Sequence, residues 1–207
     1  MVVIRRTQEE RTATTRRALL DATVACLVEH GYQGTTTTRV VERAGVSRGA
    51  QVHHFPTKND LVLAAVQHLA EKRAEAFVAS GLAALKASDD WIGDALDLIW
   101  EVHQGALFEA SMELWMAART DPELREQVAA FERGVTATFV ELCRTFLGDR
   151  ADDRQTRDDL YVVLETVRGL RLLTFVHPGE HDALDRRWQR SKIRLRRMLT
   201  WRPSDAE

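Results

Sequence analysis

The sequence is poor in the residues that build disulfide scaffolds or break chains. It has two cysteines, Cys26 and Cys143, and four prolines in 207 residues. The cysteines lie far apart, each in an apolar helical pattern, which argues against a disulfide framework or a cysteine-based zinc site. No apolar run approaches the roughly 18 residues of a membrane-spanning helix, and the N-terminus has too short an apolar stretch for a signal peptide. We therefore expect a cytoplasmic protein that does not enter the membrane.

Lysine is also scarce, with four lysines against 25 arginines, and the formal net charge is only −2. The charge is unevenly spread. Residues 1–60 carry nine Lys and Arg against six Asp and Glu, whereas the remaining 147 carry 20 against 25. A basic N-terminal part on an acidic remainder is typical of a nucleic-acid-binding head joined to a body of another kind. The overall composition, 44% hydrophobic and 29% charged, is that of a globular chain.

Motifs of common enzyme classes and metal sites are missing. The sequence contains no Walker phosphate loop, no dinucleotide-binding glycine fingerprint and no His-Glu-x-x-His pair. Gly45–Gly49 matches the Gly-x-Ser-x-Gly pattern of hydrolases, but that motif follows a strand, and a helix is expected here. His177 and His181 are four residues apart, yet Pro178-Gly179 interrupts any helix between them, so we favour a solvated loop over a metal site. We expect no enzyme, no cofactor and no metal.

The N-terminal part predicts a helix-turn-helix. Residues 1–12 are polar and are expected to form a loose arm; from Thr14 apolar residues recur at helical spacing until Gly31. Two short helices should follow, Thr38–Ala44 and Arg48–His54. Thr36 or Thr37 would cap the first and Ser47 the second, with Gly45 allowing the tight turn between them. Two short helices around a glycine-containing turn are typical of this DNA-binding motif.

These residues resemble the N-terminal domain of the TetR family of bacterial transcription regulators over about residues 12–62. The resemblance is carried by Gly31-Tyr32, Thr36-Thr37, the run Val40 to Ala50 and the run His54 to Val62. It implies a DNA-binding head over residues 1–57 and a helical ligand-binding and dimerisation body over residues 58–207. Two positions depart from the family pattern, which commonly has Leu-Tyr where this sequence has Gln51-Val52. Val52 cannot donate the phosphate contact that the usual Tyr makes, so Gln51, which can pair with adenine, or His53 could take part instead.

The predicted DNA contacts fall on both short helices and on the start of the next one. Arg48 is the candidate for a guanine contact, with a contact to phosphate alone as the alternative. The free N–H groups at the start of the first short helix suit a phosphate. The family resemblance adds Lys58 as a phosphate contact, and His54 could pack or touch a phosphate. The full set is Thr37, Thr38, Arg39, Ser47, Arg48, Gly49, Gln51, His53, His54 and Lys58.

The body is expected to be all-α as well. Together with the head, the apolar periodicity predicts about nine helices, of which one runs from Lys58 to about Ser80 and Asp121-Pro122 starts another. The family resemblance implies that the last two long helices form a four-helix bundle with a second copy and that the others enclose a ligand cavity. The candidate cavity residues are Trp100, His103, Phe108, Met112, Trp115, Phe131, Phe139, Cys143 and Arg168. His103, Glu113 or Arg168 could select a polar group of the ligand.

Residues 186–197 are rich in arginine and contain no acidic residue. A second nucleic-acid surface is one interpretation; a solvated or dimer-edge helix, paired with acidic residues at 152–153 and 158–159, is the favoured one.

The predicted function is a ligand-responsive DNA-binding regulator, most simply a homodimeric repressor of a near-palindromic double-stranded operator that a small apolar or amphipathic effector releases. Activation would look the same in the sequence. The alternative is a small-molecule-binding or enzymatic helical protein with a vestigial head, but no acid–base or nucleophile constellation supports it.

Overall fold

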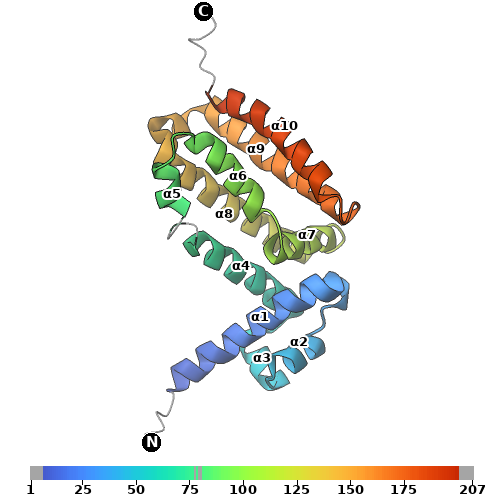
Figure 1. Ribbon diagram of the computed structural model, residues 1–207. Coiled ribbons are helices and arrows are strands. Elements are labelled where there is room, and N and C mark those ends of the chain that lie inside the picture. The colour runs from blue at the N-terminus through green and yellow to red at the C-terminus, as the bar shows by residue number, and fades with distance from the viewer. Residues whose placement is uncertain (1–6, 77, 79–80, 201–207) are drawn as a thin grey trace, which may run out of the picture. The chain divides into compact units, whose positions relative to one another are not determined.

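The computed structural model describes residues 7–76, 78 and 81–200 (Figure 1). These residues form ten α-helices, two 3-10 helices and no strand, which confirms the all-α prediction. The α-helices are α1 (Gln8–Gly34), α2 (Thr37–Ala44), α3 (Arg48–His54), α4 (Lys58–Ala76), α5 (Leu82–Lys86), α6 (Trp91–Val102), α7 (Ala106–Ala118), α8 (Pro122–Leu147), α9 (Arg154–Leu172) and α10 (His181–Thr200); the 3-10 helices are η2 (Gly148–Asp152) and η3 (Leu173–Phe175). The additional helix is α5, whose five residues are too few to show a period.

The N-terminal arm is shorter than predicted. Residues 1–6 lie outside the described residues, but α1 already begins at Gln8, so the expectation of a loose arm as far as residue 12 is wrong. Thr7 and Glu10 form a capping box, in which each side chain accepts the backbone N–H of the other residue, at 3.2 and 2.8 Å. This pairing satisfies two N–H groups that a helix start would otherwise leave open, and it extends the helix into a polar segment.

The chain divides into two compact units. The first comprises Met1–Ala74 and Gly105–Arg133, and the second comprises Glu75–Gln104 and Gly134–Glu207. The first unit therefore contains α7 and the N-terminal half of α8 in addition to the three head helices and nearly all of α4. A functional boundary between residues 57 and 58 stays a prediction.

Two clusters of buried side chains hold the first unit together. In one, Leu19, Leu20 and Cys26 of α1 surround Val40 of α2 and also pack near Phe55 and α4. In the other, one end of α1 packs with α4, α7 and the start of α8; its members are Leu27, Tyr32, Val62, Val66, Ala110, Leu114, Ala118, Leu124 and Val128. Every one of these side chains is at most 9% exposed, so the helix-turn-helix is packed against a buried apolar core.

The second unit is built around two tryptophans. Trp100 of α6 stacks on Trp188 of α10 with ring centres 5.0 Å apart and planes 3° from parallel. The Trp188 indole N–H donates to Asp97, 3.0 Å away, and Asp97 also pairs with Lys192. Figure 1 shows α9 and α10 running side by side in orange and red, and both contribute to this cluster.

Arg171 of α9 is buried in the same unit, with only 8% of its surface exposed. Its Nε and Nη2 donate to the Trp100 carbonyl at 3.2 and 2.8 Å, and its guanidinium carbon lies 3.5 Å from the centre of the Trp100 ring. Trp100 is in the last turn of α6, where carbonyls lack helical partners and a cation is favoured. Arg171 therefore caps the C-terminal end of α6.

None of the helices that the structure describes is long and apolar enough to cross a lipid bilayer.

Candidate nucleic-acid interface and ligand cavity

Helices α2 and α3 and the turn between them form the predicted helix-turn-helix. Thr36 caps α2 by accepting the Arg39 N–H at 3.2 Å, and Ser47 caps α3 by accepting the Ala50 N–H at the same distance. Gly45 ends α2 with φ 65° and ψ 32°, a left-handed conformation that suits glycine. The cap residues that the sequence pointed to therefore set the ends of both helices.

Most of the predicted DNA-contacting side chains lie on the surface of the head. Thr38, Arg39, Ser47, Arg48, Gly49 and His53 are exposed, and Thr37, His54 and Lys58 are partly buried. Arg48 donates from Nη1 to the Thr37 hydroxyl at 3.2 Å, which brings the starts of α2 and α3 together. Arg39 donates to the Gly34 carbonyl. The predicted DNA-contacting residues at the N-terminal ends of α2 and α3 thus lie together in one polar patch.

Gln51 is the exception, because it belongs to the interior of the head. Its surface is 1% exposed, and its Nε2 donates to the Phe55 carbonyl at 2.6 Å. The prediction that Gln51 contacts a base is therefore wrong for this conformation: the amide would have to leave the core to reach DNA. The neighbouring Val52 is 48% exposed. The sequence did hold the signal, since the family pattern has an apolar Leu at this position.

Lys58 is held against Tyr32 rather than free in solvent. Its Nζ donates to the Tyr32 carbonyl at 2.6 Å and lies 3.9 Å from the centre of the tyrosine ring. Burial lowers the pKa of the Lys58 ammonium. A phosphate contact by Lys58 stays a prediction. His54 packs beside Phe55, at 6.2 Å between ring centres, and burial, followed by His53 and Arg16, lowers its pKa.

Sequence reasoning missed two arginines of the head. The Arg16 guanidinium on α1 lies 5.5 Å from the centre of the Phe55 ring, next to α3. Arg43 on α2 makes a bidentate pair with Glu29 on α1, with both N–O distances 2.6 Å, and this pairing lowers the pKa of the Glu29 carboxyl. These contacts join residues 14 or more apart in the chain, so no local pattern reveals them.

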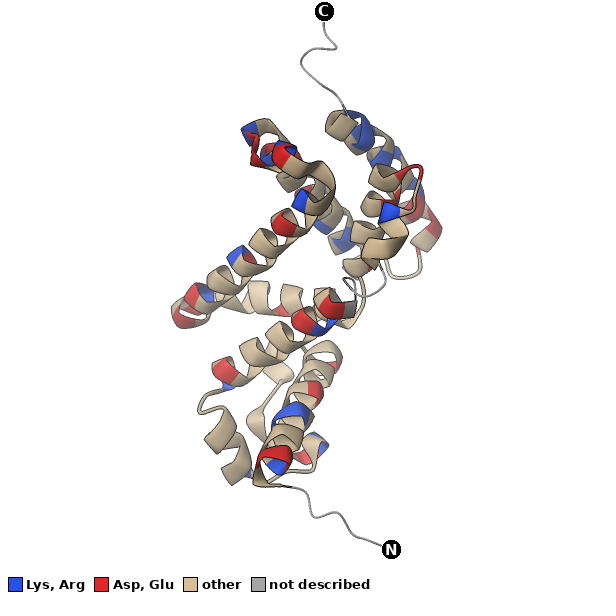
Figure 2. Cartoon of the chain, turned by 90° about the vertical axis from the view of Figure 1, so that its left-hand side faces the viewer, with Lys and Arg blue, Asp and Glu red and all other residues tan. Residues whose placement is uncertain are grey.

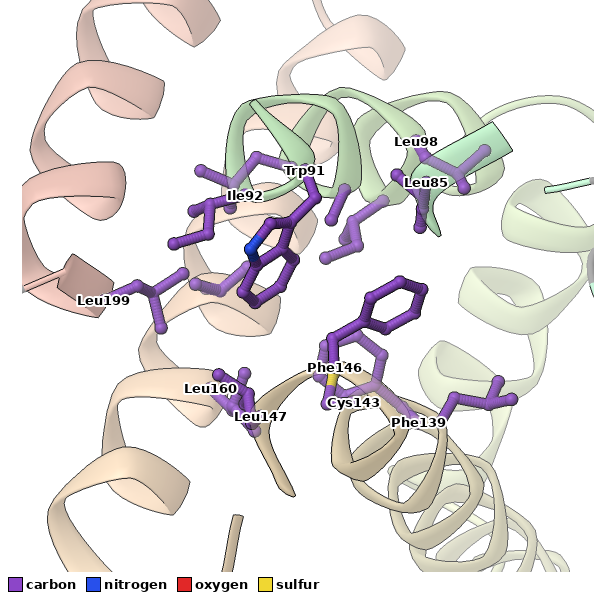
Figure 3. A pocket seen from close by; sticks show the side chains of 15 residues that line it. Leu85, Trp91, Ile92, Leu98, Phe139, Cys143, Phe146, Leu147, Leu160 and Leu199 are labelled. Atoms are coloured by element: carbon purple, nitrogen blue, oxygen red, sulfur yellow. The ribbon is translucent and has the colours of Figure 1, made fainter. Parts of the chain in front are cut away.

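A cavity of about 90 Å³ lies within the second unit. Its walls are apolar side chains of α5, α6, α8, α9 and α10 (Figure 3). The lining consists of Leu85, Trp91, Ile92, Ala95, Leu96, Leu98, Ile99, Phe139, Leu142, Cys143, Phe146, Leu147, Leu160, Val163 and Leu199. Trp91 and Phe146 face each other with ring centres 5.4 Å apart, and burial raises the pKa of the Cys143 thiol to about 12. An apolar cavity of this kind stays dry and can take an apolar molecule.

Of the predicted ligand residues, this cavity includes Phe139 and Cys143. The others are distributed elsewhere. Trp100 is in the tryptophan stack. His103 Nδ1 donates to the Ile99 carbonyl, 2.8 Å away, and burial lowers the pKa of this histidine to about 4. Arg168 lies on α9. Phe108, Met112, Trp115 and Phe131 belong to the first unit, as does Glu113, whose carboxylate accepts the Tyr32 N–H.

The arginine-rich segment lies on α10, where Figure 2 shows a row of basic residues. The predicted acidic partners are wrong. Lys192 pairs with Asp97, and Arg196 pairs with Asp90 at 2.9 Å, both acids on or beside α6. Asp152 instead pairs with Arg144 at 2.7 Å. Among the residues given above as described, no three His, Cys, Asp or Glu side chains are grouped to hold a metal ion.

A capped helix-turn-helix on an all-α frame with a separate apolar cavity defines a DNA-binding protein with a helical body. Comparison with known proteins identifies the particular family. Residues 19–65 match the family model described as bacterial regulatory proteins, tetR family. The chain is 37% identical over 198 residues to the HTH-type transcriptional regulator CymR of Pseudomonas putida, covering 94% of this chain and 90% of CymR. It is 30% identical to the HTH-type transcriptional repressor AcnR of Corynebacterium diphtheriae, covering 83% and 86%.

Solved structures agree. A TetR-family member from Streptomyces coelicolor A3 superposes with a TM-score of 0.66 at 25% identity, over 90% of this chain and 99% of that one. The multidrug binding protein EbrR, complexed with ethidium, superposes with a TM-score of 0.59 at 26% identity, over 90% and 96%. The chain belongs to the TetR family and is a helix-turn-helix transcriptional regulator.

Proposed function

We propose that this regulator is a homodimeric repressor that binds a near-palindromic operator and is released when a small molecule occupies its second unit. The observation that carries the proposal is the Ser47-capped helix α3 with Arg48 exposed at its leading end. A recognition helix enters the major groove by its N-terminal residues, so Arg48 stands where base edges are read. The transcriptional regulator CymR and the transcriptional repressor AcnR, which are similar to most of this chain, support a regulator that binds DNA.

The contacts divide between bases and phosphates. We assign Arg48 to a guanine, because a guanidinium can bond bidentately to its O6 and N7. Thr37, Thr38 and Arg39 lie in the first turn of α2, where open N–H groups and the positive helix end suit a phosphate. His53, exposed on α3, and Lys58 complete the phosphate contacts; Gln51 is left out because it is buried.

The dimer would use α9 and α10. Both helices expose large apolar side chains: Tyr161, Val162 and Leu172 on α9 are 40–43% exposed, and Ile193 on α10 is 55% exposed. A second copy covering these side chains would remove them from water. Two heads in a symmetric dimer then meet half-sites about 34–36 Å apart, which is why the operator should be near-palindromic.

The cavity of the second unit is the proposed effector site. Its lining presents only apolar surface, which suits an apolar effector or the apolar part of an amphipathic one. EbrR, complexed with ethidium, shows that a similar chain can hold an organic ligand. Release from DNA requires that the effector bind more tightly to a conformation whose heads no longer fit the operator. We propose no catalytic step, and we place the protein in the cytoplasm with its DNA.

A footprint of the purified protein on the DNA upstream of its own gene, at two salt concentrations, tests the proposal. A protected near-palindrome that persists at the higher salt would support it. Protection that is lost uniformly with salt, on this DNA and on unrelated DNA alike, would reduce the protein to non-specific phosphate binding and contradict it.

A further inference from the structure

Tyr32, at the end of α1, is held by three side chains of the first unit, two from α4 and one from α7. Gly31 interrupts the helix with φ 65° and ψ 178°, and the following Tyr32 N–H donates to Glu113 Oε2 on α7, 2.8 Å away. The Tyr32 hydroxyl donates to Asn59 Oδ1, and the Tyr32 carbonyl accepts from Lys58 Nζ. Asn59 Nδ2 in turn donates to Asp121 Oδ2 at 3.3 Å. We call Tyr32, Lys58, Asn59, Glu113 and Asp121 the Tyr32 joint.

The joint connects the DNA-reading segment to α7 and α8. Tyr32 lies in the last turn of α1, shortly before α2 in the chain, and Lys58 and Asn59 are the first residues of α4, the helix that follows α3. Glu113 is in α7, and Asp121 caps α8 by accepting the Leu124 N–H at 3.0 Å. Each flank of the helix-turn-helix therefore donates a hydrogen bond to a carboxylate outside it, Tyr32 to Glu113 and Asn59 to Asp121.

Helix α8 continues from this joint into the second unit. Its N-terminal part packs Leu124 and Val128 in the first unit, whereas its C-terminal part supplies Phe139 and Cys143 to the cavity. The two units divide at Gly134, whose carbonyl accepts the Thr138 hydroxyl at 3.0 Å. A glycine and a threonine bonded back to the preceding turn both favour bending of a helix. One helix thus belongs both to the cavity and to the joint.

We propose that Glu113 and Asp121 are positioning residues for DNA recognition: they hold the Tyr32 joint so that α3 is presented to the operator, and α8 is the element by which a change at the cavity reaches them. The proposal rests on the proposed function, since it assumes that α3 reads DNA. Neither carboxylate touches DNA. Each acts through Tyr32 or Asn59, and a hydrogen bond to a charged acceptor is strong enough to set a preferred arrangement.

The test uses two duplexes and the full-length protein. One duplex is selected by the unmodified protein from a random-sequence pool; the other is an unselected random duplex of equal length. Glu113→Ala removes the acceptor of the Tyr32 N–H, and Glu113→Gln keeps an acceptor oxygen at the same place. Glu109→Ala, one turn earlier on α7, is the matched control. Binding to both duplexes is measured at one salt concentration, and each variant is melted to confirm that it is folded.

We expect Glu113→Ala to bind the selected duplex roughly tenfold more weakly, with random-duplex binding unchanged, because non-specific phosphate contacts need no fixed presentation of α3. Glu113→Gln should recover most of the loss, and Glu109→Ala should bind like the unmodified protein. Unchanged selective binding in Glu113→Ala, an equal loss on both duplexes, or an equal loss in Glu109→Ala would each overturn the proposal.

A second pair of variants covers the case in which Glu113→Ala does not fold. Tyr32→Phe removes only the hydroxyl that donates to Asn59, and Ser111→Ala, which removes an α7 hydroxyl that donates to the Leu107 carbonyl of its own helix, is the control. We expect roughly a threefold to tenfold loss of selective binding in the first and none in the second; equal binding in both would overturn the proposal. If the unmodified protein selects no duplex from the pool, the proposed function fails, which is a different result from selection followed by variants that bind equally well.

Discussion

Replacing Gly31 with alanine should reveal how strongly the end of α1 is held. The Gly31 backbone has φ 65° and ψ 178°, a region that other residues enter at a cost of about 1–3 kcal/mol. An added Cβ would lie 2.8 Å from Glu113 Oε2, so the carboxylate must move. In moving, it gives up the Tyr32 N–H, a charge-assisted hydrogen bond worth about 1.5–3 kcal/mol. Taking the middle of each range, Gly31→Ala should lower the free energy of unfolding by about 4 kcal/mol.

A double-mutant cycle separates the two contributions. In a Glu113→Ala background the bond is already absent and the carboxylate is gone, so Gly31→Ala should cost only the backbone strain, about 2 kcal/mol. Gly45→Ala is the control, because Gly45 also has φ 65° but no atom lies within 4 Å of its added Cβ; its expected cost is about 1–2 kcal/mol. Urea denaturation of the four proteins and the control measures these values. The reasoning is refuted if Gly31→Ala costs the same in both backgrounds or no more than Gly45→Ala.

Four further predictions concern the head and the second unit. Arg48→Ala should cost about 1–3 kcal/mol of operator binding and relax preference at one base pair, as read by competition among operator variants; equal weakening on all sequences would contradict a base contact. Gln51→Ala should lower stability without changing base preference, since the side chain is buried, and altered preference at one position would contradict this. Arg171→Met should lower the free energy of unfolding, measured by urea denaturation, by about 1–3 kcal/mol. The C-terminal end of α6 loses its cation, which outweighs the relief of the cost of burying the guanidinium. An unchanged free energy of unfolding would show that Arg171 makes no net contribution. Burial lowers the pKa of His103 to about 4, so its contribution of about 3 kcal/mol should be complete above pH 6.5 and disappear as the pH falls toward 4; a His103→Leu variant with the same pH dependence of unfolding would exclude His103 as the source.

The helix-turn-helix was predictable because its signals are local. Thr36, Gly45 and Ser47 are caps and turn formers whose preferences act within four residues, and the structure places them in those roles. The early start of α1 was equally local: Thr7 and Glu10 have capping-box spacing, but a polar segment without apolar periodicity was interpreted as a loose arm. The capping-box spacing of Thr7 and Glu10 would have predicted the start of α1, although the segment has no hydrophobic periodicity.

Polar residues inside the fold were not predictable from their type. Gln51 was interpreted as a base contact because amides pair with adenine, yet its neighbours bury it and Phe55 supplies an acceptor. Glu113 was a candidate for ligand selection and instead accepts an N–H from a residue 81 positions earlier in the chain. Arg171 donates to a carbonyl at the C-terminal end of α6, although it lies 71 residues later in the chain. Such pairings depend on tertiary packing, which a single sequence does not encode in any local period.

The residues that line the cavity could not be predicted from the sequence either. Most candidates from the sequence are aromatic or sulfur-containing residues suited to an apolar pocket. Their assignment to one cavity requires knowing which helices face each other. Phe139 and Cys143 line it, while Phe108 and Met112 are buried in the first unit. Aliphatic residues that are unremarkable in the sequence, such as Ile92 and Val163, make up most of the wall.

The central claim is that α3 reads DNA sequence from two symmetric heads. Selection of duplexes from a random pool by the purified full-length protein, followed by sequencing, tests it most directly. We predict enrichment of a near-palindrome whose half-site centres are separated by about 34–36 Å, or a whole multiple of that distance along the duplex. Enrichment of no sequence, or of a single half-site without its symmetric partner, would contradict the account.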